Sequence, residues 1–251
     1  MIRAALLWLA LALPAAGESI VAGLSHSSVS ITAAFTGEEI LVYGAVRRDA
    51  PPPEGPPLHV VVTVEGPPTP VTVRKKDRRL GIWVNTESVE VDRAPSFYVI
   101  ATTARLEDIL SETENLRHQV TIPRAIRAVG ISEQAEQSER FVDALIRIRQ
   151  EERRYRRSEG TVSLTEETLF RADVALPANL TEGDYRVRIF LTRDAQVVDF
   201  QEQVIFVRKE GLERLIHAMA HDMPLIYGLL SLLIAVLAGW GASALFRLIR
   251  V

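Results

Sequence analysis

The sequence predicts a mainly β protein: an immunoglobulin-like β-sandwich, then an α+β segment or a second sandwich, and one C-terminal transmembrane helix. Three patterns support this. Short apolar runs alternate with turn residues from Ser19 to Thr103, a helical stripe of apolar side chains interrupts further strands after Arg105, and no charged residue occurs between Asp222 and Arg247. The 251 residues are 47% hydrophobic and 24% charged, which is the composition of a folded chain.

The first 17 residues have the layout of a signal peptide. Arg3 supplies the positive charge, residues 4–13 are apolar, and small residues follow up to Gly17. Ten apolar residues would form a helix of about 15 Å, roughly half of a bilayer core, which is too short to span it. We therefore expect cleavage after Gly17, export of the chain, and a mature protein that begins at Glu18.

Residues 18–104 are expected to form the immunoglobulin-like sandwich domain. Alternating apolar and polar residues are typical of half-buried strands, and proline-rich stretches such as residues 51–53 belong in connections or at sheet edges. About seven strands are expected, at residues 29–35, 40–46, 59–64, 71–74, 81–85, 88–91 and 97–102.

Residues 105–209 are expected to form an α+β domain or a second sandwich. A short helix is expected at residues 106–110, and Ser132 has the side chain of a helix N-cap. Apolar residues at helical steps then predict a long helix over residues 133–157, namely Phe141, Leu145, Ile148 and Tyr155. Further strands are expected at residues 162–164, 168–176, 185–192 and 197–207, with a turn at Asp194-Ala195.

Residues 223–246 predict a transmembrane helix. These 24 uncharged residues would span about 36 Å, enough for a hydrocarbon core of roughly 30 Å. Tyr227 and Trp240 lie toward the two ends, where aromatic side chains favour the membrane interface. Residues 210–222 are expected to form an interfacial helix and residues 247–251 a cytoplasmic tail, with the N-terminal domains exported.

Composition and motifs exclude several classes of function. Without cysteine, the chain has no disulfide, no thiol nucleophile and no Cys-ligated zinc site. A net charge of −3 and a pI near 6.0 give no global attraction to nucleic acid. The usual signatures of hydrolases, nucleotide-binding enzymes, dehydrogenases and zinc peptidases are absent, so no catalytic residue and no cofactor is indicated.

Glu213, His217 and His221 recur at every fourth residue and are the candidate metal ligands. On a helix they would share one face, and imidazole with carboxylate suits zinc or copper. The alternative, which we prefer, is the polar face of an interfacial helix whose apolar side carries Leu215 and Met219.

Two basic clusters occur, and both are interleaved with acidic residues or adjoin them. We interpret them as a solvated hairpin tip and a solvated helix face, with an acidic partner or a lipid headgroup as the alternative. The clusters are Arg74, Lys75, Lys76, Arg78 and Arg79, and Arg153, Arg154, Arg156 and Arg157.

Small residues recur at every fourth position of the expected membrane helix, at Ser231, Ala235, Gly239 and Ser243. Such a ribbon lets a second helix approach closely, so that van der Waals packing and hydrogen bonds can hold the pair together. The ribbon therefore favours a helix with a partner, either an integral membrane protein or a second copy of this chain.

A series of short motifs runs through nearly the whole mature chain. They are Val29-x-Ile31, Phe35-Thr36-Gly37, Tyr43-Gly44-Ala45, Phe97-Tyr98, Leu176-Pro177, Gly183-x-Tyr185, Tyr227-Gly228 and Gly239-Trp240. Their order resembles the uncharacterised putative transmembrane proteins of alphaproteobacteria, although Ala195 stands where such patterns often place glycine. The resemblance implies a bacterial inner-membrane location, no catalytic residues, and neighbouring exporters of the sulfite or organosulfonate type.

Three functions are consistent with these patterns. The preferred one is a non-enzymatic periplasmic accessory protein, anchored in the inner membrane as the partner of an integral transporter. The second is a periplasmic metal- or ligand-binding module, using Glu213, His217 and His221 or an undetected pocket. The third is a membrane-tethered hydrolase with a dispersed site. Stoichiometric bound metal would favour the second, and turnover on a substrate panel the third.

Overall fold

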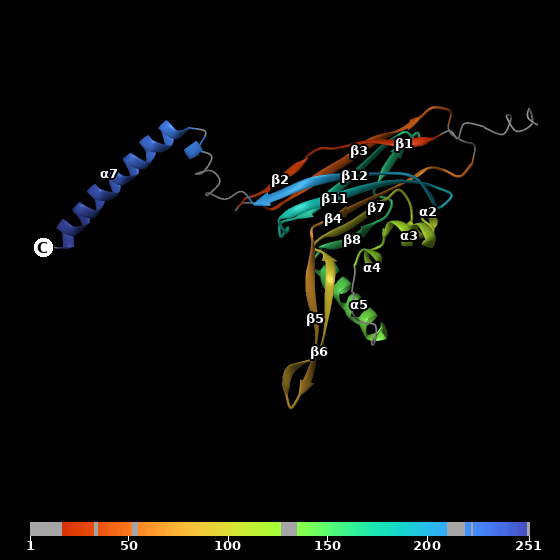
Figure 1. Cartoon of the computed structure of the whole chain (residues 1–251), viewed down its shortest axis with the longest axis horizontal. Helices are drawn as coiled ribbons and strands as arrows, with labels where there is room; N and C mark the ends of the chain where they lie inside the picture. The colour runs from red at the N-terminus through yellow and green to blue at the C-terminus, as the bar shows by residue number, and fades with distance from the viewer. Residues whose placement is uncertain are drawn as a thin grey trace, which may run out of the picture. The chain divides into compact units, whose positions relative to one another are not determined.

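The computed structural model describes residues 17–32, 35–51, 55–126, 135–209, 219–221 and 223–249 (Figure 1). Strands make up 51% of the structure and helices are few, so the prediction of a mainly β protein with an apolar C-terminal helix is confirmed. The chain divides into two compact units, of which residues 30–35 and 208–251 form the smaller.

The first sheet, sheet A, has the strand order β1-β3-β10-β9 and is antiparallel throughout. Along β10 every second side chain from Phe170 to Leu176 is buried, because successive side chains of a strand point to opposite faces of the sheet. Gly44 of β3 lies beneath Phe170: a Cβ there would come within 2.6 Å of that ring. The strands are β1 (Glu18–Leu24), β3 (Gly37–Arg48), β9 (Ser163–Thr165) and β10 (Leu169–Pro177).

The second sheet, sheet B, has the order β2-β12-β11-β4-β7-β8. β4 and β7 are almost completely buried, so their sequences are apolar runs without alternation, as expected where both faces of a strand are covered. β7 and β8 pair in parallel. The strands are β2 (Ser28–Ile31), β4 (His59–Glu65), β7 (Tyr98–Thr102), β8 (Tyr155–Ser158), β11 (Gly183–Arg193) and β12 (Gln196–Lys209).

Four helices and the base of a long hairpin cover the outer face of sheet B, on the side away from sheet A (Figure 1). Phe141 and Leu145 of α5 pack there with Val61, Ile100 and Phe190 of the sheet in one apolar cluster. The covering elements are α2 (Leu106–Ile109), α3 (Glu112–His118), α4 (Ile122–Ala125), α5 (Ala135–Glu151), and the hairpin of β5 (Pro68–Arg79) and β6 (Ile82–Pro95).

The segments 18–104 and 105–209, expected as two domains, share both sheets. β10 pairs with β3 over nine residues, β11 lies between β4 and β12, and β8 extends the sheet beyond β7. Within residues 18–104, β5 and β6 pair only with each other, and β6 joins the two short strands expected at 81–85 and 88–91. The alternation of residues indicates a strand but does not identify its neighbour.

The expected helix 133–157 is shorter in the structure, and Ser132 lies outside the described residues. α5 ends at Glu151, and Arg153 has a left-handed backbone with φ of 59°. Tyr155 then begins β8, where its buried hydroxyl donates a hydrogen bond to the Pro95 carbonyl at 2.7 Å. Tyr155 is thus buried because it lies on strand β8, although its spacing in the sequence also fits the predicted helical stripe.

Glu18 anchors the beginning of β1, directly after the expected signal peptide, of which residues 1–16 lie outside the described part. Its carboxylate pairs with Arg48 at 2.7 Å and with Arg193 at 3.0 Å. Burial alone would raise the pKa of the Glu18 carboxyl, but the hydrogen bonds and charges of Arg193 and Arg48 outweigh it and hold the pKa below the usual value near 4.5. The expected mature terminus is therefore tied to both sheets.

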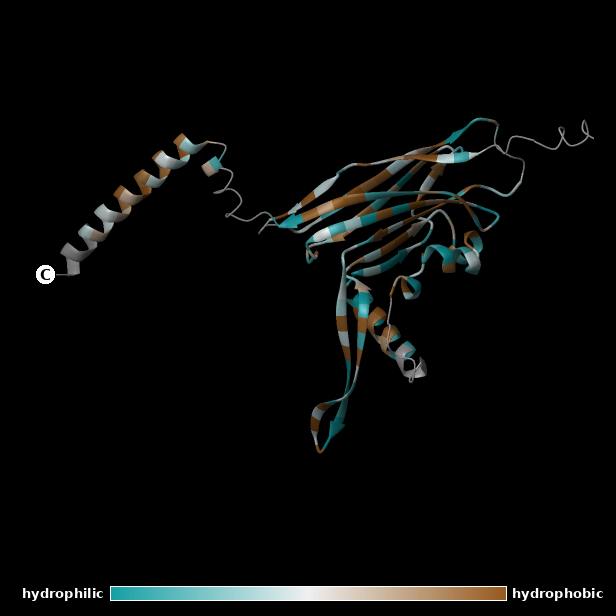
Figure 2. Ribbon diagram, viewed as in Figure 1, coloured by the Kyte–Doolittle hydropathy of each residue, from teal (hydrophilic) through white to brown (hydrophobic). Residues whose placement is uncertain are grey.

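The smaller unit contains α7 (Pro224–Ile249). The 20-residue window Pro224–Ser243 of this helix is the candidate membrane span and has a mean hydropathy of 2.1. Twenty residues of helix are about 30 Å long, the thickness of a bilayer core. The ribbon of α7 is mostly brown to white in Figure 2, in agreement with its apolar sequence. By length and composition α7 can therefore span a membrane, as predicted for residues 223–246.

Candidate functional site

The candidate metal ligands are only partly placed, because Glu213 and His217 lie outside the described residues. His221 belongs to a helical turn at residues 219–221. In the described part of the chain, no group of three or more His, Asp or Glu side chains is arranged to hold a metal ion.

The second basic cluster lies at the end of α5 and on β8, and its charges are partly paired. Arg157 contacts Glu107 at 2.6 Å and also Glu159, and Arg154 lies 3.3 Å from Glu152. The hydrogen bond to Glu107 is the main reason why the pKa of the Arg157 guanidinium is raised. Arg157 thus links α2 to β8, whereas Arg153 and Arg156 have no ion-pair partner among the described residues.

The ribbon of small residues lies on α7, with all four members exposed in the single chain: Ser231, Ala235, Gly239 and Ser243. The Ser231 hydroxyl donates to the Tyr227 carbonyl at 2.7 Å, within its own helix. An added Cβ at Gly239 would meet nothing within 4 Å. The ribbon is therefore open to a second helix.

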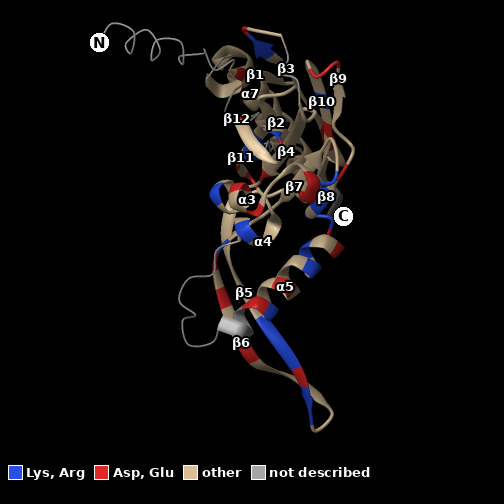
Figure 3. Cartoon of the chain, turned by 90° about the vertical axis from the view of Figure 1, so that its right-hand side faces the viewer, with Lys and Arg blue, Asp and Glu red and all other residues tan. Residues whose placement is uncertain are grey.

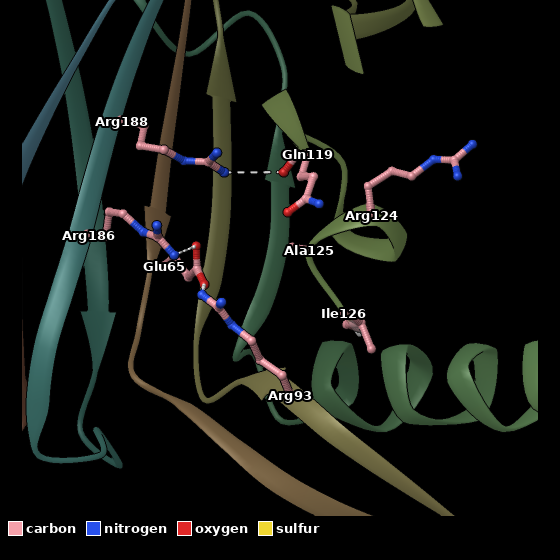
Figure 4. Close-up of a pocket in the computed structure, with 8 residues that line it drawn as sticks. All are labelled: Glu65, Arg93, Gln119, Arg124, Ala125, Ile126, Arg186 and Arg188. Atoms are coloured by element: carbon pink, nitrogen blue, oxygen red, sulfur yellow. Dashed lines mark hydrogen bonds and ion pairs between the residues drawn. The ribbon is translucent and has the colours of Figure 1, made fainter. Parts of the chain in front are cut away.

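A pocket of about 370 Å³ opens beside sheet B, and arginine side chains dominate its lining (Figure 4). Four guanidinium groups and a single carboxylate surround it. The pocket is lined by Glu65, Arg93, Gln119, Arg124, Ala125, Ile126, Arg186 and Arg188.

Strand register brings the charged groups together. Arg186 and Arg188 are two residues apart on β11 and so share a face, while Val187 and Ile189 point to the opposite side and are fully buried. Arg186 is paired with Glu65 at the end of β4, and Glu65 with Tyr98 of β7. One row across three strands thus supplies an arginine, a carboxylate and a phenol.

Glu65 is buried between two arginines. Its Oε2 lies 3.0 Å from Arg186, and its Oε1 lies 3.4 Å from Arg93 at the end of β6. Since one carboxylate neutralises one positive charge, the four guanidinium groups around the pocket keep a net positive charge.

Arg188 is held in place by groups on every side. It donates to the His118 carbonyl at 2.6 Å and to the Tyr98 hydroxyl at 3.0 Å, and its guanidinium lies over the Phe190 ring, 5.4 Å from the centroid. Its Nε is buried and has no hydrogen-bond partner among the described residues. Arg188 is therefore a fixed cation in the wall of the pocket.

The C-terminus of α3 provides the acceptors for Arg188. Gln119 follows the helix in the left-handed conformation, with φ of 50°, and its carbonyl accepts from Arg188 at 3.2 Å (Figure 4). Carbonyl groups at a helix C-terminus carry a partial negative charge that favours a cation. Burial raises the pKa of Tyr98 to about 12, so its hydroxyl stays protonated and donates to the Val120 carbonyl at 2.9 Å.

This arrangement is suited to binding an anion. The planar fork of a guanidinium group can donate to two oxygens of a carboxylate, sulfonate, sulfate or phosphate, and charge-assisted bonds of this kind are about twice as strong as neutral ones. The fourth arginine, Arg124 of α4, is exposed and points away from the other three in Figure 4. Arg93, Arg186 and Arg188 thus form the inner part of the site.

Sequence reasoning missed this pocket, although one signal was present. Arg186 and Arg188 stand at alternate positions of a strand whose other residues, Tyr185, Val187 and Ile189, are apolar. Two cations on one face of a buried strand indicate either paired charges or an anion site. Glu65, the partner of Arg186, lies 121 residues away from it, where no local pattern could connect the two.

Comparison with known proteins gives a family and remote similarity to solved structures. No curated protein matches the chain. The crystal structure of Spo0M, a sporulation control protein from Bacillus subtilis, is similar over 81% of this chain and 54% of that one, with 9% identity and a TM-score of 0.26. The chain thus spans about half the length of that structure, and so remote a similarity carries no functional argument.

A family model described as "Putative transmembrane protein" matches residues 19–248, which is nearly the whole chain. This match confirms the resemblance seen in the sequence, and it agrees with the apolar helix α7. The chain belongs to this family of alphaproteobacterial transmembrane proteins.

Proposed function

We propose that the chain is a non-enzymatic accessory protein, anchored in a membrane by α7, whose β-rich unit binds a small oxyanion-bearing molecule in the arginine pocket. The observation that carries the proposal is the excess of guanidinium groups in the pocket, where Glu65 is the single carboxylate beside Arg93, Arg186 and Arg188. A volume of about 370 Å³ is in the range of small-ligand sites, which measure about 300 to 1,000 Å³. A bound oxyanion would supply the negative charge and the acceptors that these guanidinium groups favour.

Arg188→Lys is expected to weaken oxyanion binding about tenfold. Lysine keeps the positive charge but loses the planar fork and the Nε donor, and a hydrogen bond to a charged group contributes about 1.5 to 3 kcal/mol. Titration calorimetry on the full chain in mild detergent, with sulfate, phosphate and methanesulfonate as probes, would measure the change.

Arg171→Lys is the matched control, because Arg171 is exposed on β10 and pairs with Asp173 of the same strand at 3.0 Å. It should bind the probes like wild type. If wild type binds none of the three anions, or if Arg188→Lys binds as well as the control, the pocket is a structural ion-pair network and not a ligand site.

The membrane context is part of the same proposal. The signal-like residues 1–17 support export, so we place the β-rich unit in the bacterial periplasm, α7 in the inner membrane and the C-terminus in the cytoplasm. The ribbon on α7 supports a helix partner, for which we propose an integral transporter. An exporter of sulfite or organosulfonates would handle anions of the class that the arginines suit.

Gly239→Leu is expected to remove most of the partner recovered with the chain from native membranes. The larger side chain would block close approach of a second helix, yet it raises hydrophobicity, so the variant should still insert. The measurement is a pull-down in mild detergent with Ala235→Leu alongside. Leu237→Ile, on another face of α7, is the control, and equal recovery from all of these proteins would show that α7 is only a tether.

A further inference from the structure

The outer half of the β5–β6 hairpin stands apart from the rest of the β-rich unit (Figure 3). Near its base, Val73, Val89 and Val91 pack into the apolar cluster below sheet B. From Arg74 to Trp83 every side chain is exposed. The six residues of β5 beyond Val73 extend about 20 Å, and such an unsupported two-stranded ribbon is at best marginally stable in water.

The tip of this ribbon is apolar. Leu80 is 105% exposed, Ile82 65% and Trp83 69%. Burying a side chain of this size stabilises a protein by about 1.5 to 3 kcal/mol. All three side chains stay exposed, so they do not contribute this stabilisation to the fold.

The turn of the hairpin also places an unusual residue, leucine, at a position with a left-handed backbone. Leu80 has φ of 51° and is followed by Gly81 with φ of 86°. Two-residue hairpin turns of this kind favour Asn-Gly or Asp-Gly, because a left-handed backbone is strained for leucine. The chain therefore holds an apolar side chain at the outermost position of the hairpin, where the local preference is for a polar one.

The ribbon directly behind the tip is positively charged, as the blue stretch along β5 in Figure 3 shows. Between Arg74 and Glu87 there are five basic residues and two acidic ones. Lys75 pairs with Glu87 at 3.1 Å, whereas the other four have no ion-pair partner among the described residues: Arg74, Lys76, Arg78 and Arg79.

We propose that the tip of the β5–β6 hairpin docks on an anionic lipid surface. Leu80, Ile82 and Trp83 would enter the boundary between headgroups and acyl chains, where tryptophan is preferred, and the arginines would lie at the level of the lipid phosphates. Opposite charge favours this occupant, since each cation near an anionic leaflet contributes about 1 kcal/mol. Because α7 lies in the same chain, a bilayer is always nearby. The proposal is independent of the arginine pocket.

The test uses the fluorescence of Trp83 in the full chain. The sequence has three tryptophans, so replacing Trp8 and Trp240 by Phe leaves Trp83 as the single one. This protein is reconstituted into vesicles of phosphatidylethanolamine with phosphatidylglycerol, or of phosphatidylcholine alone. In the anionic vesicles Trp83 emission should shift to the blue and be quenched by lipids brominated close to the headgroup, and high salt should reduce both effects.

Two variants of the single-tryptophan protein separate the contribution of the apolar tip from that of the basic residues. Leu80→Asn should lower the ratio of docked to free hairpin about tenfold, while the thermal midpoint of the β-rich unit stays equal or rises, because asparagine tolerates the turn better. Replacing Arg78 and Arg79 by Gln should lower the ratio about fivefold per charge. Val198→Asn removes an apolar side chain that is 43% exposed on β12 and should change nothing.

Three outcomes would overturn the proposal. Trp83 could stay water-exposed in the anionic vesicles, which excludes lipid contact. It could be shielded equally in phosphatidylcholine with no effect of the Arg→Gln changes, which excludes recognition of anionic lipid. Or shielding could appear only after membrane proteins are added, which would assign the tip to a protein partner.

Discussion

Leu232→Arg is expected to release the chain from the membrane or to eliminate it by degradation. Leu232 lies near the middle of the window Pro224–Ser243, and its side chain is 66% exposed in the single chain. A charge at the centre of a membrane helix costs about 2.5 to 3.5 kcal/mol on insertion scales. The hydrophobic window of α7 would then be split into two segments, each too short to span a bilayer core.

Membrane fractionation with an alkaline wash, combined with immunoblotting of whole cells, would measure the loss. Leu232→Ile, which keeps the volume and the hydrophobicity, should behave like wild type. If Leu232→Arg remained in the washed membranes at wild-type abundance, α7 would not be the membrane anchor, and the lipid-docking hairpin would have to supply the attachment.

The individual strands could be predicted because alternation is a local property. Residues 168–176 were expected as a strand and β10 covers Leu169–Pro177, and the hairpin of β11 and β12 lies where its sequence pattern indicates. The pairing of strands from residues 18–104 with strands from residues 105–209 was not predictable in this way. A period of two tells which face of a strand is buried, but the same face can pack in many sheets. The pairing of β3 with β10 joins residues more than 120 positions apart.

The charged residues of the arginine pocket could not be recognised in the sequence for a related reason. Runs of basic residues such as Arg74 to Arg79 attract attention in a sequence, yet neighbouring residues of a strand point to opposite faces, so such runs are mostly solvent-exposed. The arginine pocket instead uses Arg186 and Arg188, at alternate positions. Gln119, which also lines the pocket, has a left-handed backbone at the end of α3. Glycine or asparagine is the usual residue at such a helix end, so no signal in the sequence indicated that α3 ends there.

Glu65→Gln is expected to have two opposite effects, because Glu65 is both the counter-ion of the pocket and the competitor of any bound anion. Its carboxylate is buried and pairs with Arg93 and Arg186, whose side chains are 46% and 34% exposed. Removing one partner of a fully buried ion pair costs about 3 to 5 kcal/mol, and partial exposure of the arginines reduces this to about 2 kcal/mol. The variant should therefore unfold at lower urea concentration than wild type.

The same change should strengthen oxyanion binding, because the guanidinium groups of Arg93 and Arg186 lose their internal acceptor. We expect the affinity for sulfate to rise about fivefold or more, and saturating sulfate to restore most of the lost stability, since a ligand that binds only the folded state stabilises it by mass action. Urea unfolding of the full chain in mild detergent, with and without sulfate, would measure both. Sodium chloride at equal ionic strength is the control for screening.

These two effects separate a ligand site from a structural network. A purely structural cluster of arginines would lose stability in Glu65→Gln and recover equally with sulfate or chloride, because screening acts on any exposed charge. A built anion site would recover selectively with the oxyanion, and adding Arg188→Lys to the same chain should abolish that selectivity. Equal rescue by both salts, or no gain in affinity for sulfate, would contradict the proposed binding function.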